Sequence, residues 1–325
     1  MRILIIGGTR FVGLHFARAA LAAGHDVTVL HRGKTGADLL PEATHLIADR
    51  DADLSVLRGG SWDATVDVCA YFPRQVRELA AALDPGAAGR YLLVSTMGVY
   101  AVPDAPGFTE DSPLLPADGP EADAVSPATY GTLKVQCERT ALEAFGPETL
   151  LIRPTYVIGP DDYTHRFDHW VQRLARGGEV LAPGLPEAPV QVVDARDLAT
   201  WTLALLEGGA SGAYHAAATP PPFGMRDLLD TIASAVAPPG TTLTWVDDEF
   251  LLSAGLTGRT LPLWSPDPLL RATSTADPAA AIATGLRLRP VADTARDIPA
   301  FEPLPEALTP AREAELLAAW HRQQA

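Results

Sequence analysis

Two short motifs hold the residue types in this chain that could do chemistry. The first, Gly7-Gly8-Thr9-Arg10-Phe11-Val12-Gly13, directly follows the apolar run Ile3–Ile6. Glycines in such a turn let backbone amides approach a pyrophosphate closely. The positive end of the following helix dipole favours the negative charge of that pyrophosphate. The second, Tyr130-Gly131-Thr132-Leu133-Lys134, puts a phenol and an ammonium four residues apart, on one face of a helix. In this order, the motifs predict a bound nicotinamide dinucleotide with a proton donor beside it.

Strands and helices that would position these motifs alternate through the first half of the chain. Helices are predicted over Val12–Ala23, over Gln75–Leu83 and around Tyr130. The strands between them are predicted at Ile3–Ile6, Val27–Leu30, Ala43–Ala48, Ala64–Cys69, Tyr91–Ser95 and Thr149–Ile152. Apolar strands in this alternation are typical of an α/β fold with a doubly wound parallel sheet, the Rossmann arrangement. We expect 1–155 to form this domain together with about 191–215, and 156–190 with 216–325 to form a smaller C-terminal α/β unit that binds substrate.

Three further segments have recognisable features. Residues 101–127 contain six prolines and six carboxylates and interrupt the alternation, which suits a lid or an ordinary surface loop equally well. Helices are predicted over Phe167–Arg176 and over Asp197–Leu206, with Asp197 as the N-cap. Thr309-Pro310 is expected to begin a last helix that ends near Trp320.

Charge and composition exclude several classes of partner. The chain has 40 acidic and 25 basic residues, a net charge of −15, whereas binding to nucleic acid requires a stripe of basic residues. No apolar run is long enough to span a bilayer, and the strand after Met1 leaves no room for a signal peptide. Cys69 and Cys137 form neither a disulfide framework nor a metal motif, so we expect a cytoplasmic protein. His165 and His169 lack further ligands, so no metal is expected.

The end of the second predicted strand bears on the choice of dinucleotide. It has Leu30-His31-Arg32-Gly33-Lys34, where an NAD-binding domain would have an acidic residue for the ribose 2′-hydroxyl. Arg10 and Arg32 could together bind the 2′-phosphate of NADP, because guanidinium groups match phosphate oxygens. Asp49, after the third strand, could accept a hydrogen bond from the adenine amino group. The sequence therefore favours NADP(H), with NAD left open.

These motifs resemble those of the extended short-chain dehydrogenase/reductases, the NAD-dependent epimerase/dehydratase branch, over residues 1 to about 300. The most similar subgroup opens with a GGTRFVG-like turn. The resemblance makes Thr96, Tyr130 and Lys134 the catalytic residues. It also assigns Cys69, Ala70 and Pro154 to the cofactor, with Gly7, Thr9, Arg10, Phe11, Val12, Gly13 and His31. The chain departs from the family at Tyr156, where sugar-nucleotide enzymes have asparagine, and at Asp67, where histidine is usual.

These residue types imply a mechanism. An ammonium at Lys134 and a cationic nicotinamide favour the phenolate form of Tyr130, which would exchange a proton with a substrate oxygen held by Thr96. Lys134 would also bind the nicotinamide ribose. We expect Tyr163, Arg166 and Trp170 to line the substrate pocket, while Trp264 could be core or lid.

The expected function is an NADP(H)-dependent oxidoreductase acting on a small carbonyl or alcohol. A dimer would be common for the family. The alternatives are an epimerase or dehydratase that retains its cofactor, a redox-sensing regulator, and an RNA-binding protein akin to chloroplast stem-loop-binding proteins.

Overall fold

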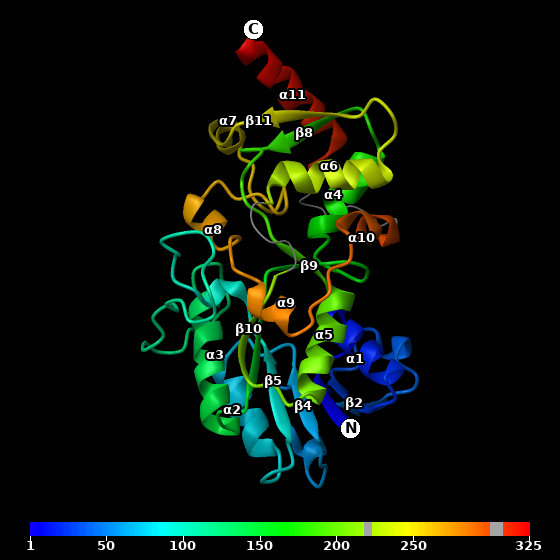
Figure 1. Cartoon of the computed structure of the whole chain (residues 1–325), viewed down its shortest axis with the longest axis vertical. Helices are drawn as coiled ribbons and strands as arrows, with labels where there is room; N and C mark the ends of the chain where they lie inside the picture. Colours follow the sequence, from blue (N-terminus) through cyan, green and yellow to red (C-terminus); the bar gives the residue numbers. More distant parts are fainter. Residues whose placement is uncertain (218–222, 300–307) are drawn as a thin grey trace.

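The architecture is built around one seven-stranded sheet. The structure is a computed structural model that describes residues 1–217, 223–299 and 308–325. All strands of the sheet are parallel, in the order β10-β6-β5-β4-β1-β2-β3 (Figure 1). They are β1 (Arg2–Ile6), β2 (Asp26–His31), β3 (Thr44–Ile47), β4 (Ala64–Asp67), β5 (Arg90–Val94), β6 (Leu150–Pro154) and β10 (Gly212–Ala216).

Helices cover both faces of this sheet, which explains why its strands are apolar on both sides. Ile3 and Ile5 of β1 pack toward the helices α1 (Phe11–Ala22) and α5 (Ala195–Glu207). Leu4, the residue between them, faces the opposite core, under α2 (Pro73–Ala82) and α3 (Tyr130–Phe145). Alternate residues of a strand point to opposite faces, so a strand covered on both sides must be apolar throughout. The predicted doubly wound α/β fold is confirmed.

The second unit has its own hydrophobic core beyond the carboxyl ends of the strands (Figure 1). The parallel pair β8 (Glu179–Pro183) with β11 (Thr242–Val246) belongs to this unit. A second parallel pair, β7 (Tyr156–Ile158) with β9 (Val192–Asp194), contributes side chains to both cores. The longer helices of the second unit are α4 (Arg166–Ala175), α6 (Met225–Val236) and α11 (Pro310–Gln324), and its shorter ones are α7 (Asp248–Ser253), α8 (Pro268–Ala272) and α10 (Val291–Asp297). The short helix α9 (Ala279–Ala283) instead packs against β10 of the large sheet. The described chain has no helix of sufficient length and apolarity to cross a bilayer.

The segment 101–127 folds back against the end of the sheet. Arg153, at the end of β6, pairs with the buried Glu138 at 2.7 Å and also donates to the Tyr100 hydroxyl and the Glu110 carbonyl. The Glu110 side chain accepts from the backbone N–H of His215 on β10 at 2.8 Å. These buried charge-assisted bonds attach the segment to β6 and β10. Glu110 therefore holds this part of the segment beside the sheet.

One predicted helix cap is wrong. Asp197 lies within the first turn of α5, and its carboxylate accepts from Arg289 at 2.8–3.0 Å. The N-cap is Asp194, which accepts from the backbone N–H of Arg196. Both aspartates are compatible with the first turn of a helix, and only the β9 register, with Asp194 as its last residue, selects between them. The cap predicted at Thr309 is confirmed, since its side chain accepts from Arg312 N–H.

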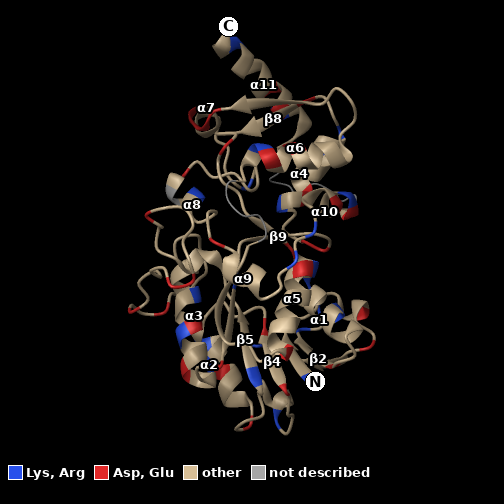
Figure 2. Ribbon diagram, in the orientation of Figure 1, with Lys and Arg blue, Asp and Glu red and all other residues tan. Residues whose placement is uncertain are grey.

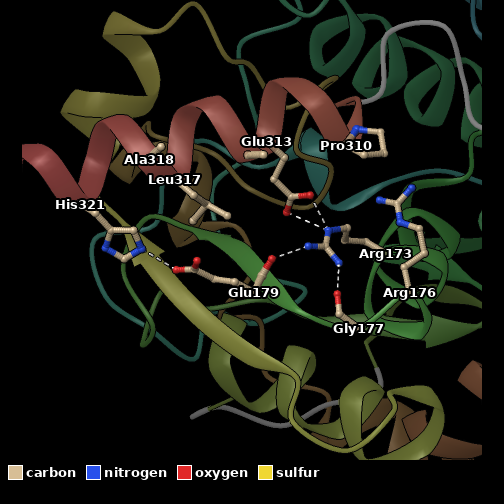
Figure 3. A pocket seen from close by; sticks show the side chains of 10 residues that line it. Arg173, Arg176, Gly177, Glu179, Pro310, Glu313, Leu317, Ala318 and His321 are labelled. Carbon is tan, nitrogen blue, oxygen red and sulfur yellow. Dashed lines mark hydrogen bonds and ion pairs between the residues drawn. The ribbon is translucent and has the colours of Figure 1, made fainter.

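A buried ion pair fastens α11 to the second unit (Figure 3). Arg173 of α4 donates to both carboxylate oxygens of Glu313, at 2.8 and 2.6 Å, and to the carbonyls of Gly177 and Glu179. Glu313 also accepts from the Leu181 backbone N–H at 3.0 Å, which joins α11 to β8. A cavity of about 460 Å³ lies beside this pair, between α11 and the start of β8, remote from the carboxyl edge of the sheet.

Candidate active site

The turn after β1 has no room for side chains at two of its glycines. A Cβ on Gly7, whose φ is +88°, would lie 2.7 Å from the Cys69 sulfur, and one on Gly13 would lie 2.5 Å from the Gly7 carbonyl oxygen. Cys69 therefore packs directly beneath the turn, and its burial raises the pKa of its thiol. The bare backbone and the α1 N-terminus form a cradle that fits the pyrophosphate of a dinucleotide.

A cavity of about 410 Å³ opens from this turn toward the ends of β2 and β3. Three cations line it, namely Arg10, Arg32 and Lys34, and none of them has an ion-pair partner in the described part of the chain. Asp49 lies at the far end of the same cavity. Of the residues predicted for the cofactor, those that line it are Gly7, Thr9, Arg10, Phe11, Val12, Gly13, His31, Arg32, Asp49 and Cys69.

His31 reaches this cavity but uses both ring nitrogens within the protein. Its Nδ1 accepts from the Gly33 backbone N–H at 3.0 Å, so Nε2 carries the proton and donates to His45 Nδ1 at 2.9 Å. His45 Nε2 then donates to the Leu40 carbonyl at 3.0 Å. Burial lowers the pKa of His31, and the nearby His45 lowers it further. His31 thus orients the turn that presents Arg32.

A second cavity, of about 360 Å³, contains the predicted catalytic residues. Thr96 follows β5 and accepts from the Gly98 N–H at 3.1 Å, while Tyr130 and Lys134 lie in the first turns of α3. Lys134 is 3% exposed, and its Nζ donates to the carbonyls of Ala70 and Val94, both at 2.8 Å. These two acceptors fix the ammonium at the carboxyl edge of the sheet. Ala70 and Pro154, the remaining predicted cofactor residues, line this cavity too.

The two cavities form one continuous cleft. They share the lining residues Phe11, Val12, Val68, Tyr71 and Tyr163. The Arg10 guanidinium lies 3.7 Å from the centre of the Tyr163 ring, which is a cation–π contact across the boundary between the cavities. A dinucleotide on the glycine turn would have its adenosine half among the cations and its nicotinamide half beside Tyr130.

Sequence reasoning missed a buried ion pair beneath the cleft. Asp67, at the end of β4 and 0% exposed, accepts two hydrogen bonds from Arg50, at 2.7 and 2.8 Å, and one from the Tyr91 hydroxyl. Burial raises the pKa of Asp67, but the Arg50 charge outweighs it and the pKa lies below its usual value. An aspartate in an apolar strand needs a cation. Arg50 follows β3, which ends at the same carboxyl edge of the sheet as β4, and that position was the available signal.

The three residues predicted for the substrate pocket separate in the structure. Tyr163 and Arg166 line the 360 Å³ cavity. Trp170 does not, because it is 1% exposed in the core of the second unit, where its indole N–H donates to the Pro262 carbonyl at 2.7 Å. Four-residue spacing puts Arg166 and Trp170 on similar sides of α4, but only Arg166, at the first position of the helix, reaches the cavity, while Trp170 one turn later lies in the core. Trp264 is also a core residue, and it donates to Asp248 at 2.9 Å.

No cluster with the makings of a metal site occurs among the described residues. His165 pairs with Asp168 at 3.0 Å, while His169 is half-buried, and the loss of water around its ring lowers its pKa to about 4. The adjacent Asp162 accepts from Thr164 instead. These groups therefore organise the start of α4.

Comparisons with known proteins agree with this arrangement. Residues 3–217 match the sequence model of the "NAD dependent epimerase/dehydratase family". The chloroplast stem-loop binding protein of 41 kDa b from Arabidopsis thaliana is 31% identical over 221 residues, which cover 63% of this chain and 55% of that relative. The match thus spans about half the length of that protein.

Solved structures show the same fold at low identity. The Bordetella bronchiseptica enzyme WbmH, in complex with NAD⁺, is 20% identical with a TM-score of 0.68, over 91% of this chain and 96% of that one. The human epimerase family protein SDR39U1, with NADPH, is 18% identical with a TM-score of 0.63, over 91% and 98%. The family match covers most of the chain and includes the glycine turn, Thr96, Tyr130 and Lys134. The chain therefore belongs to the NAD-dependent epimerase/dehydratase family.

Proposed function

We propose that the protein is an NADP(H)-dependent oxidoreductase that interconverts a small carbonyl compound and its alcohol. One arrangement carries the proposal: Thr96, Tyr130 and Lys134 line one cavity, and that cavity continues into a second one lined by cations. A cavity of about 360 Å³ that must also admit the nicotinamide ring is at the small end of the range for ligand sites. It suits a substrate of few atoms.

Each of the three side chains has a separate role in the proposed reaction. When bound, the reduced nicotinamide supplies a hydride to the carbonyl carbon. Tyr130 transfers its hydroxyl proton to the carbonyl oxygen, so that the C=O bond becomes an alcohol and the phenolate remains. Lys134 stabilises that phenolate by its charge, while its two backbone acceptors hold the ammonium in position. Thr96 donates a hydrogen bond to the same oxygen and orients the carbonyl.

The preference for NADP(H) rests on the cations at the end of β2. Arg32 and Lys34 are exposed and lack ion-pair partners among the described residues, and β2 ends in His31 rather than in a carboxylate. A 2′-phosphate would gain charge-assisted hydrogen bonds there. The ribose 2′-hydroxyl of NAD would find no acidic partner at the end of the strand.

Cofactor titrations test the proposal directly. We expect NADPH to bind at least about tenfold more tightly than NADH, the ratio that corresponds to one charge-assisted hydrogen bond. Arg32→Asp should remove this preference, whereas Arg259→Asp, the same charge change at an exposed site in the second unit, should preserve it. Tyr130→Phe should abolish turnover while leaving the dissociation constant for NADPH unchanged. Equal affinities of the unmutated protein for NADPH and NADH would refute the cofactor assignment.

The family match also supports a second reaction class, an epimerase or dehydratase that returns the hydride to its substrate. Such an enzyme keeps its cofactor through the catalytic cycle. Native mass spectrometry of the freshly purified protein distinguishes the two. A stoichiometric dinucleotide that survives desalting favours epimerisation or dehydration, and free exchange of the cofactor favours net oxidation and reduction.

The name of the Arabidopsis relative brings RNA binding into consideration, but charge argues against it here. The cationic residues are interspersed with acidic ones along the ribbon (Figure 2), and the net charge is −15. Affinity for a phosphate backbone depends on released counterions, and hence on clustered Lys and Arg. We expect no gel shift of a stem-loop RNA at physiological salt below micromolar protein. A nanomolar dissociation constant would establish the RNA-binding alternative.

A further inference from the structure

Arg166 is a cation on the substrate side of the cleft with much of its hydrogen-bonding capacity unused. It is the first residue of α4, after His165 in the left-handed conformation. Its Nε donates to the Thr164 hydroxyl at 3.0 Å, and its guanidinium carbon lies 5.4 Å from the centre of the Tyr156 ring. These two contacts fix the side chain from one side. In the described residues, neither terminal Nη group makes a hydrogen bond or an ion pair.

Among the residues that the structure describes, no carboxylate lines the cavity around Arg166. Its polar lining is made of hydroxyl groups, together with Lys134, whose ammonium is held by two carbonyls. The nearest acidic residues in the chain, Asp162 and Asp168, do not line the cavity, and they bind Thr164 and His165. Arg166 is thus a cation that lines the substrate side of the cleft without a counter-ion among the described residues.

We propose that the substrate of this enzyme bears an oxyanion group, a carboxylate or a phosphate, which Arg166 binds through its two Nη groups. Guanidinium presents a planar pair of N–H donors that matches either group. The carbonyl would then lie against Thr96 and Tyr130, in the same cavity. The inference rests on the proposed function, and it names the substrates as small oxo acids or phosphorylated aldehydes and ketones. Reduction leaves the anion intact, because the hydride and the proton both go to the carbonyl.

Matched pairs of carbonyl compounds test the role of Arg166. With saturating NADPH, kcat/KM is measured for 2-oxobutanoate against its methyl ester and for dihydroxyacetone phosphate against dihydroxyacetone. We expect the anionic member of at least one pair to be favoured about 10- to 100-fold, which is the worth of a charged hydrogen-bond pair. Arg166→Gln should remove that preference mainly through KM. Arg226→Gln should not, although Arg226 also lies at the start of a helix and stacks on an aromatic ring, Trp245, at 5.1 Å. The pair of compounds that shows this preference identifies the anionic group of the substrate as a carboxylate or as a phosphate.

A binding experiment makes the test independent of turnover. Protein saturated with NADP⁺, so that the 2′-phosphate site is filled, is titrated with oxalate and with inorganic phosphate by calorimetry. At least one anion should bind the unmutated protein and the Arg226→Gln control, and its affinity should fall at least tenfold in Arg166→Gln. Equal affinity in Arg166→Gln, binding of neither anion, or preference for the neutral member of both pairs overturns the inference. The proposed function fails by a different result, namely absence of NADP(H) binding or full activity in Tyr130→Phe.

Discussion

Removing Glu313 should destabilise the protein far more than removing an exposed carboxylate on the same helix. Glu313 is 4% exposed and accepts two hydrogen bonds from Arg173 and one from the Leu181 backbone. Glu313→Ala would leave a buried guanidinium without its counter-ion, which costs about 3–5 kcal/mol. Arg173 retains the carbonyls of Gly177 and Glu179, so we expect the lower end of that range, about 3 kcal/mol.

The matched control is Glu315→Ala, two residues further along α11. Glu315 pairs with Arg312 at 3.1 Å, but the side chains are 67% and 47% exposed. Exposed pairs contribute about 0–1 kcal/mol, so this variant should be close to the unmutated protein. For 325 residues the unfolding entropy is about 0.7 kcal/mol per degree, and a loss of about 3 kcal/mol would lower Tm by about 4–5 °C.

Urea unfolding and calorimetry of both variants measure this difference. A third variant, Arg173→Met with Glu313→Leu, replaces both charges by apolar groups and should recover most of the lost stability, because the cost lies in the unpaired charge. NADPH affinity at low temperature should be unchanged in all three variants, since none of Arg173, Glu313 and Glu315 lines the cleft. If Glu313→Ala lost no more stability than Glu315→Ala, the ion pair would not be what holds α11 in place.

Three more outcomes are expected. Gly13→Ala should weaken NADPH binding at least tenfold, because its Cβ would lie 2.5 Å from a carbonyl oxygen. Gly119→Ala, with open space around it, should leave the affinity unchanged in the same titration. Retained affinity in Gly13→Ala would contradict the assignment of the glycine turn to the pyrophosphate. Lys134→Ala should reduce both NADPH affinity and kcat, and loss of kcat alone would remove its role at the ribose. Burial raises the pKa of Asp168 to about 6; the hydrogen bond from His165 opposes this rise, and the charge of Asp162 adds to it. Between pH 4 and pH 6 the folded protein therefore keeps a proton on Asp168 that the unfolded chain has released. The stability that this proton contributes is present below pH 4 and is lost as the pH rises to 6. The free energy of unfolding of Asp168→Asn, measured in urea, should therefore rise relative to that of the unmutated protein between pH 4 and pH 6. If the difference between the two free energies stayed constant over this range, the pKa shift would be contradicted.

Local signals in the sequence were sufficient for the dinucleotide-binding half. The glycine turn, the apolar strands and the spacing of Tyr130 and Lys134 each report a constraint that acts within a few residues, and the observed β1, α1 and α3 follow from them. Boundaries shifted by one or two residues because helix ends depend on tertiary contacts. The Rossmann sheet was predictable for the same reason.

Features that depend on distant segments were not predictable. Arg50 and Asp67 meet only because β3 and β4 end at the same edge of the sheet. Trp170 was predicted to face a ligand, but its position is set by the Pro262 carbonyl, 92 residues away. Helical spacing tells on which face of its own helix a side chain lies, but not what that face of the helix packs against.

The position of β10 at the sheet edge has a consequence for synthesis on the ribosome. β10 pairs with β6, yet 57 residues (155 to 211) separate the two strands, and α5, which covers part of the sheet, lies within them. At ~5–20 residues per second, the open edge of β6 is exposed for about 3–12 s before its partner emerges. During that interval the nascent chain presents unpaired N–H and C=O groups of the kind that recruit other strands. Ribosome-bound folding factors would find their target in this sheet between completion of β6 and emergence of β10.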